Sequence, residues 1–253
     1  MRPLHRLTVV ALILICTPAA APARSGHPCP RFPVGSVVTP PVDLFSQNGV
    51  LSVNLSYETT VDQNGNTLYC YITADGAESP TLHVNPGDLL NVTLTNETPV
   101  PAASSATMQV SPDSSVCGAA SMDGSSTNMH FHGTNTSPIC GQDEVIHTLI
   151  NSGQSFTYNV QFPADEPPGL YWYHAHVHGL SEAAVLGGAS GAIIVEGIEK
   201  LQPTVAGLPQ RLLIVRDNPV PGNPTPGGTV PSWDLSLNFI PVPTPITRPP
   251  SFR

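Results

Sequence analysis

The sequence has few charged residues and almost no lysine. Only 11% of its 253 residues are Asp, Glu, Lys or Arg, and Lys200 is the only lysine. Long helices draw on Ala, Leu, Glu and Lys, so this scarcity argues against a helical protein. The formal net charge is −9. An acidic chain repels phosphates, which excludes nucleic acid as a partner.

Apolar runs long enough to span a bilayer are also missing. The run LTVVALILIC covers only residues 7–16, about half of the roughly 20 residues that a transmembrane helix needs. Two arginines precede this run, and the small residues of TPAAAPA follow it, which suits cleavage after Ala21 or Ala23. We therefore expect residues 1–23 to be a signal peptide and the protein to be secreted or periplasmic, without a stable membrane anchor.

Cysteine is scarce but even in number once the signal peptide is set aside. Four cysteines remain, and in an exported chain they predict two disulfides among three possible pairings: Cys29, Cys70, Cys117 and Cys140. We favour Cys117–Cys140, which would tie down the segment between them.

Proline and glycine are abundant instead, with 29 and 21 residues. Together with many Thr, Ser, Val and Asn, they predict short strands joined by turns. Residues 24–44 form a Pro-rich lead-in, and strand patterns then fill one domain at 45–199. Residues 200–253 hold one strand pattern, RLLIVRDNP, and a Pro/Gly-rich tail. We expect this last segment to be the start of a second domain, because it is too small to enclose a core.

Alternating apolar residues predict an all-β antiparallel sandwich. Residues 51–73 alternate, turn through DQNGN and resume, which predicts a β-hairpin, and residues 80–98 do the same around NPGD. Residues 154–163 form one clean alternating strand. Residues 187–197, GGASGAIIVEG, predict a buried strand, and residues 99–128 are expected to be a loop.

Histidines are concentrated in two motifs, MHFHG and YWYHAHVHG. Alternate residues of a strand share one face about 6–7 Å apart. His130 and His132 should therefore project together, as should His174, His176 and His178. Neutral imidazole is a good ligand for copper, zinc, iron and nickel, so the two motifs predict a metal site if their strands are adjacent. His27, His83 and His147 have no partner at this spacing, and we expect them to be structural.

These motifs and their surroundings resemble the multicopper oxidase, laccase-like family. TNMHFHG and GLYWYHAHVHG are similar to its first and second copper motifs, and GGASGAIIVEG to the strand that closes its first cupredoxin domain. The resemblance runs roughly from Leu51 to Gly197. It implies a cupredoxin-like Greek-key β-sandwich, with RLLIVRDNP at the start of a second cupredoxin domain.

The resemblance also implies a ligand set for copper. His130 would bind the type 2 copper, His132 and His174 would share one type 3 copper, and His176 would bind the other. His178 falls outside the usual ligands and would lie next to them without binding the metal.

An acid is implied as well. Asp143, in CGQDEVIHT, lies roughly where the family has a carboxylate that assists proton delivery to bound oxygen. The spacing departs from the usual laccase pattern, and an ordinary acid in a surface loop is the alternative.

The family's type 1 copper site has no counterpart here. Such a site needs a thiolate and two imidazoles, but no cysteine of this chain has a histidine neighbour and no histidine follows His178. The resemblance therefore implies half of a trinuclear site in a truncated oxidase, inactive alone, which would use dioxygen and a reducing substrate once a C-terminal domain completed it. The alternatives are a stand-alone periplasmic copper-binding or sequestration protein and a zinc-binding β-sandwich.

Overall fold

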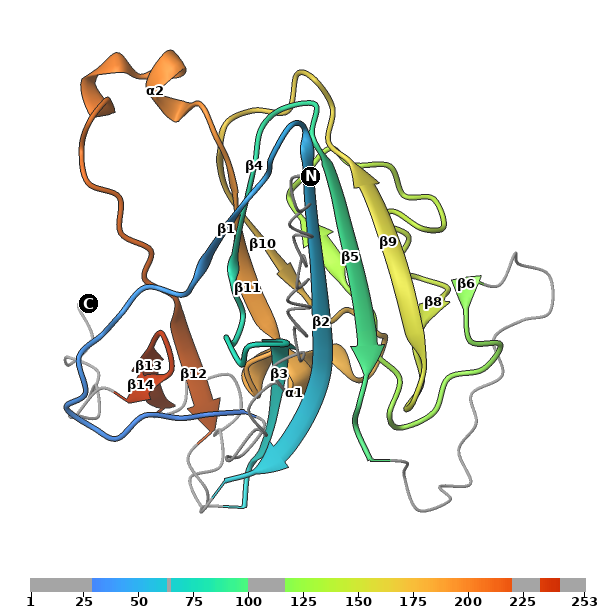
Figure 1. Ribbon diagram of the computed structural model, residues 1–253. Helices are drawn as coiled ribbons and strands as arrows, with labels where there is room; N and C mark the ends of the chain where they lie inside the picture. The colour runs from blue at the N-terminus through green and yellow to red at the C-terminus, as the bar shows by residue number, and fades with distance from the viewer. Residues whose placement is uncertain (1–28, 63–64, 100–116, 220–232, 242–253) are drawn as a thin grey trace, which may run out of the picture.

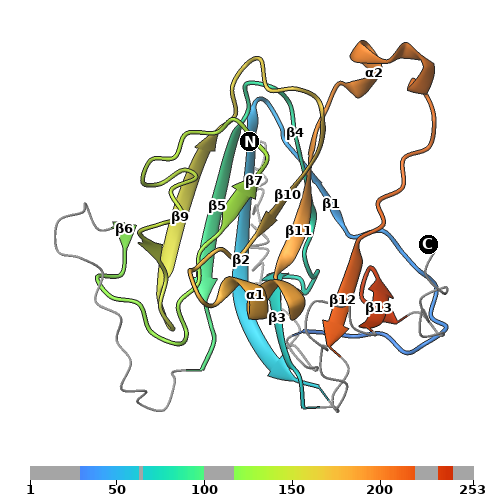
Figure 2. The same cartoon turned by 180° about the vertical axis from the view of Figure 1, so that it is seen from behind.

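The computed structural model describes residues 29–62, 65–99, 117–219 and 233–241. The predicted signal peptide at residues 1–23 lies outside them, as does most of the predicted loop at 99–128. The described residues include two large β-sheets packed face to face, with one short helix at the lower end of the sandwich and another set apart from it (Figure 1, and from behind in Figure 2).

One sheet has five strands and the other has four. The five-stranded sheet runs in the order β1 (Asp43–Phe45), β4 (Thr81–Val84), β11 (Ser190–Val195), β10 (Gly169–His174) and β7 (His130–His132). The four-stranded sheet runs in the order β3 (Thr67–Thr73), β2 (Val50–Val61), β5 (Leu89–Asn96) and β9 (Ser155–Gln161).

Smaller elements complete the described chain. A two-stranded ladder joins β6 (Cys117–Gly118) to β8 (Thr148–Leu149), and a three-stranded sheet contains β12 (Val215–Pro219), β13 (Trp233–Leu237) and β14 (Ile240–Pro241). The helices are α1 (Ser181–Leu186), α2 (Ile198–Leu201) and a 3-10 turn at Pro203–Val205.

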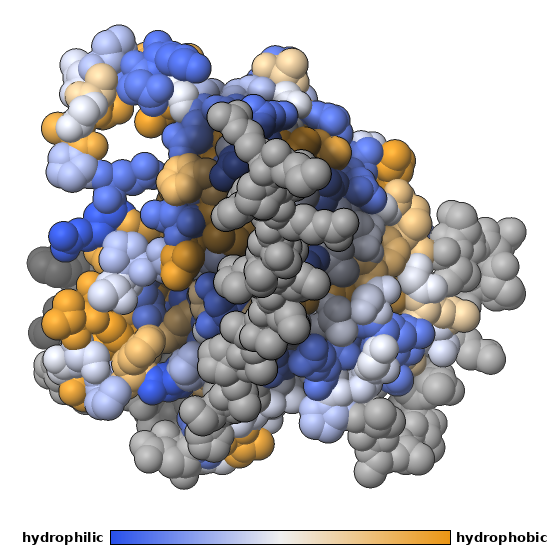
Figure 3. All heavy atoms as spheres, viewed as in Figure 1, coloured by the Kyte–Doolittle hydropathy of each residue, from blue (hydrophilic) through white to orange (hydrophobic). Residues whose placement is uncertain are grey.

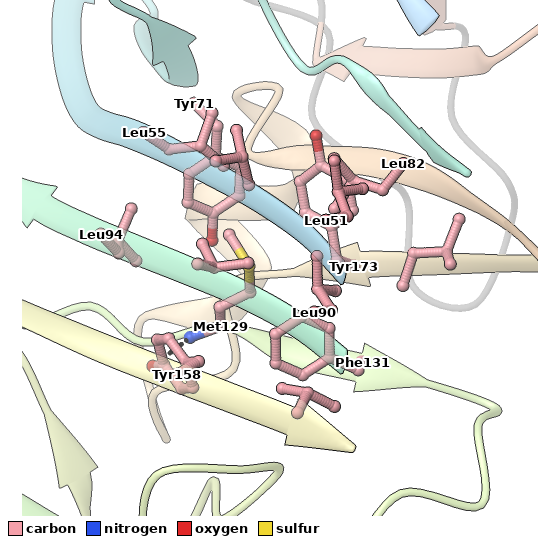
Figure 4. Packing of buried hydrophobic residues seen from close by; sticks show 14 of the residues in the cluster. Leu51, Leu55, Tyr71, Leu82, Leu90, Leu94, Met129, Phe131, Tyr158 and Tyr173 are labelled. Carbon is pink, nitrogen blue, oxygen red and sulfur yellow. Dashed lines mark hydrogen bonds between the residues drawn. The ribbon is translucent and has the colours of Figure 1, made fainter. Parts of the chain in front are cut away.

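The core lies between the two large sheets and follows from the alternation in the sequence. In β5, Leu90, Val92 and Leu94 are fully buried while the residues between them are only partly covered. Alternate residues of β9 behave the same way. Burial of such apolar side chains contributes about 1.5–3 kcal/mol each, and Figure 4 shows them packed against side chains of the opposite sheet. The predicted all-β sandwich is confirmed.

Strand pairing confirms one predicted hairpin and shows that the other was wrong. β2 and β3 pair antiparallel, as expected of residues 51–73. β4 and β5, on either side of the NPGD turn, belong to different sheets. Because the chain crosses between sheets here, β5 pairs in parallel with β2 and β4 pairs in parallel with both β1 and β11. The sheets are therefore mixed, not purely antiparallel.

Two disulfides are present. The favoured Cys117–Cys140 pair is confirmed, and it joins β6 to the loop that follows β7. The second bond, Cys29–Cys70, attaches the lead-in segment to β3.

The predicted tail holds two strands that its proline content had hidden, β13 and β14. Their small sheet contacts the sandwich through a buried arginine. Arg216 donates from Nη2 to the Ser190 carbonyl at 2.7 Å, and its guanidinium lies 3.9 Å from the Phe239 ring centroid. Arg31, from the lead-in segment, lies 4.3 Å from the same ring. The cation–π contact of Arg31 thus joins the lead-in segment to the small sheet, and the hydrogen bond of Arg216 joins that sheet to the sandwich. The domain boundary near residue 200 stays a prediction.

On the face in Figure 3, hydrophobic and hydrophilic residues are interspersed. Among the residues that the structure describes, no helix has both the length and the apolar character needed to cross a bilayer.

Gly191 is predicted to be essential for the packing of β10 against β11. It lies opposite Tyr173 in the strand register, and a Cβ there would collide with the phenol ring. Because cores tolerate added volume poorly, we expect Gly191→Ala to lower the free energy of unfolding in urea by about 2–3 kcal/mol. Gly169→Ala is the matched control, since its Cβ would meet nothing closer than 3.8 Å. Equal losses in the two variants would contradict this packing.

Candidate metal centre

The two histidine motifs lie side by side because β7 and β10 are neighbours in one sheet. They pair antiparallel, with His174 opposite His130 and Trp172 opposite His132. Phe131 and Tyr173 are opposite each other between these pairs and point into the core, where both are fully buried. Because strand residues alternate in direction, the histidines emerge together on the other face of the sheet.

Three imidazoles converge closely enough to share a metal ion. His130, His132 and His174 each offer a ring nitrogen within 4.8 Å of the other two. The closest pair is His132 Nδ1 and His174 Nε2, at 3.3 Å. Two metal–nitrogen bonds of about 2.0–2.1 Å at a tetrahedral angle would separate their nitrogens by about 3.3 Å. The pair therefore fits two ligands on one ion.

His176 joins the cluster but not through the strand. β10 ends at His174, so the prediction of one continuous strand through all three histidines was wrong. The His176 ring centroid nonetheless lies 5.0 Å from that of His130 and 5.5 Å from that of His174. Its backbone N–H donates to Asn128 Oδ1 at 2.8 Å, which holds this residue beyond the end of the strand.

His178 lies beyond the end of β10. It begins the turn that follows the motif, and its side chain is exposed. The sequence predicts that His174, His176 and His178 share one face of a strand, but β10 ends at His174.

Asp143 contacts the cluster directly. Its Oδ1 accepts hydrogen bonds from His130 Nδ1 and from the Phe131 backbone N–H, both at 2.9 Å. An ionised carboxylate only accepts, so Nδ1 of His130 carries the hydrogen and Nε2 keeps its lone pair for a metal. Asp143 is therefore not an ordinary acid in a surface loop, because its side chain contacts a histidine of the cluster. Its predicted role in proton delivery stays a prediction.

His174 is held neutral by its surroundings. Burial is the main cause that lowers its pKa to about 4; the neighbouring imidazoles of His130, His176 and His132 contribute in the same direction, and a hydrogen bond to a backbone carbonyl opposes them. That bond runs from Nδ1 to the Ala175 carbonyl at 2.9 Å, which leaves Nε2 free to bind a metal. Burial also lowers the pKa of His176. Both rings are therefore unprotonated near neutral pH.

Trp172 covers one side of the cluster. Its ring stacks on His174 with centroids 4.0 Å apart and lies 5.0 Å from His132. The same indole lines a groove together with Leu170 and Leu213. The indole therefore covers one face of the His174 ring.

Two other histidines lie away from the cluster, as expected. His83 is buried, with Nδ1 2.6 Å from Glu196 Oε1 and Nε2 3.1 Å from Asp43 Oδ1. His147 Nδ1 lies 3.1 Å from Glu144 Oε1 in its own loop. Both are paired with carboxylates, which is consistent with structural roles.

Asn128 was missed by sequence reasoning. It stands two residues before His130, and nothing in the pattern of the motif distinguishes it from its polar neighbours. Its importance comes from a contact with a residue 48 positions away, which only the fold reveals.

Comparison with known proteins gives one consistent family. Residues 120–200 match the family model described as multicopper oxidase. Laccase-2 of Trametes villosa is 29% identical over 131 residues, 47% of this chain and 23% of that protein. An iron transport multicopper oxidase of Kluyveromyces lactis is 32% identical over 82 residues, 31% of this chain and 12% of that protein. The matched part thus spans about a quarter or less of these relatives.

Solved structures agree on the fold. A laccase-like multicopper oxidase from Ochrobactrum sp. gives a TM-score of 0.54 at 16% identity, and McoA from Aquifex aeolicus gives 0.52 at 16%. In both comparisons the match covers 81% of this chain and 42% of the other.

The low pKa of His174 predicts a pH dependence of stability in metal-free protein. The unfolded chain binds a proton near pH 6.5, whereas the folded one binds it only near pH 4. Stability should therefore fall as the pH drops from 6.5 to 4. His174→Gln, which cannot titrate, should show a shallower fall in urea denaturation with chelator present. If both proteins lost stability in parallel, His174 would not be held neutral.

Proposed function

We propose that this chain, which resembles the multicopper oxidases in sequence and in fold, supplies four of the histidine ligands of a trinuclear copper site. The convergence of His130, His132, His174 and His176 on one face of the β7–β10 pair carries the proposal. Two His-x-His motifs far apart in the sequence meet there only because of the strand register.

The contacts support a specific division of the ligands. The 3.3 Å separation of His132 Nδ1 and His174 Nε2 supports their sharing one type 3 copper. His130, whose Nδ1 is occupied by Asp143, would bind the type 2 copper through Nε2. His176 would bind the second type 3 copper.

The donor set suits copper. Imidazole nitrogens without thiolates or clustered carboxylates are typical of copper, iron and zinc, and copper adds the one-electron redox chemistry needed to reduce dioxygen to water. The protein's part is to present neutral rings in fixed tautomers. Asp143 and the Ala175 carbonyl each accept a hydrogen bond from Nδ1 of a ligand histidine, and Trp172 stacks on the His174 ring.

We assign proton delivery to Asp143. Reduction of dioxygen to water consumes protons, and this carboxylate lies beside His130 at the edge of the cluster. Its side chain is 11% exposed, so it can exchange a proton with solvent while it remains in contact with the site. The remaining copper ligands and the binding site for the reducing substrate would come from protein beyond the described residues.

Location in a secreted or periplasmic compartment is part of the proposal. The two disulfides support it, because such bonds persist in oxidising compartments and are rare in the cytosol.

Copper binding is expected to depend on the clustered histidines and not on histidines elsewhere in the chain. Protein expressed with copper and zinc together should retain copper, and His130→Ala and His176→Ala should each weaken Cu²⁺ binding at least tenfold in competition titrations, a loss on the scale of removing a metal-site contact. His83→Gln is the matched control, since His83 is as buried as His174 but lies outside the cluster. Retention of zinc alone, or equal losses in all three variants, would refute a copper site here.

Asp143→Asn is expected to weaken copper binding by roughly 10–100-fold, because outer partners orient metal-bound histidines. Glu144→Gln provides a neighbouring control. That carboxylate accepts from Ile146, His147 and Thr148 of its own loop and contacts no clustered histidine. Both variants should be titrated with Cu²⁺ under conditions in which each remains folded. A similar loss in Glu144→Gln would mean that the loop as a whole, and not the Asp143–His130 contact, supports binding.

A further inference from the structure

We propose that Asn128 is the positioning residue that holds His176 in the metal centre and couples it to the loop carrying Asp143. The inference rests on the proposed function, since it concerns the geometry of the same four histidines. It adds a residue that is not itself a ligand.

The Asn128 side chain makes hydrogen bonds to three residues in two separate parts of the chain. Its Oδ1 accepts from the His176 backbone N–H at 2.8 Å. Its Nδ2 donates to the carbonyls of Val145 at 3.0 Å and Thr148 at 3.2 Å. The residue is fully buried, so water cannot replace these partners at low cost.

His176 depends on this contact because it follows the last residue of β10. The ladder to β7 ends with the His130–His174 pair, so the strand no longer fixes the backbone at His176. At that point the backbone is held instead by the hydrogen bond that the His176 N–H donates to Asn128 Oδ1. Because Asn128 stands two residues before His130, one side chain ties the second motif to the first.

The same amide restrains the loop that carries Asp143. Val145 and Thr148 follow Asp143 closely in the chain, and their carbonyls are held by the two hydrogens of Nδ2. The position therefore needs an acceptor and two donors on one short side chain. Asparagine has both, whereas aspartate lacks the donors and alanine lacks all three groups.

The protein contains a matched residue for comparison. Asn96 is equally buried, and its Nδ2 donates to the carbonyls of Ser125 and Ile150, both at 2.7 Å. Its Oδ1 accepts from the Thr98 backbone N–H at 3.1 Å. It thus has the same number of backbone partners, and none of them is a histidine.

The experiment compares Asn128→Ala, Asn128→Asp and Asn96→Ala with the wild-type protein. Amide hydrogen exchange at His176, followed by NMR in metal-free protein, reports whether the residue is held. Cu²⁺ affinity, measured well below the unfolding temperature of each variant, reports the consequence for the site.

We expect Asn128→Ala to speed exchange at His176 at least tenfold and to weaken Cu²⁺ binding by roughly 10–100-fold, the usual effect of losing an outer partner. Asn128→Asp keeps the acceptor, so it should restore the protection of His176 even where it loses stability. Asn96→Ala should lose comparable stability while His176 exchange and Cu²⁺ affinity stay within about threefold of wild type, a difference below 1 kcal/mol.

Unchanged exchange at His176 in Asn128→Ala, or an equal loss of affinity in Asn96→Ala, would overturn the proposal. If Asn128→Ala failed to fold, fast His176 exchange in Asn128→Asp would overturn it as well. A wild-type protein that binds no Cu²⁺ would refute the proposed copper site, and the exchange comparison would still decide whether Asn128 holds His176.

Discussion

The pairing of β7 with β10 is the constraint on which the candidate metal centre depends. With His174 opposite His130, all the histidines of these two strands emerge on one face, and a slip of one residue would turn one set into the core. Phe131 and Tyr173 prevent that slip because both are buried on the other face. The same hydrophobic packing that stabilises the sandwich therefore fixes the register of the ligands.

Hydrogen bonds then determine the features of the site that the strand register does not. The sheet brings the rings together, but it does not choose their tautomers or place residues beyond the end of a strand. Asp143 and the Ala175 carbonyl each take a hydrogen from one ring nitrogen, and Asn128 holds the backbone at His176. Burial keeps His174 neutral. The contacts of Asp143 and the Ala175 carbonyl each leave the lone pair of a ring Nε2 available for a metal.

Local patterns predicted the parts of this structure that depend on local rules. Alternation in residues 89–96 and 155–161 predicted two strands and their buried faces, because one side of each lies on the core. Alternation does not show which sheet a strand joins, so it predicts a hairpin at the NPGD turn, whereas the chain passes between sheets there. Alternation also predicts that His178 shares a face with the ligands, because no local sequence signal marks the end of β10. The role of Asn128 depends on tertiary contacts and had no sequence signature.

The most direct test of the central claim is the anomalous scattering of copper in crystals grown with Cu²⁺. A copper peak is expected within bonding distance of His132 and His174, the pair whose ring nitrogens lie 3.3 Å apart. Further density is expected within reach of His130 and His176. A peak elsewhere on the protein, or none among these four histidines at full copper loading, would contradict it.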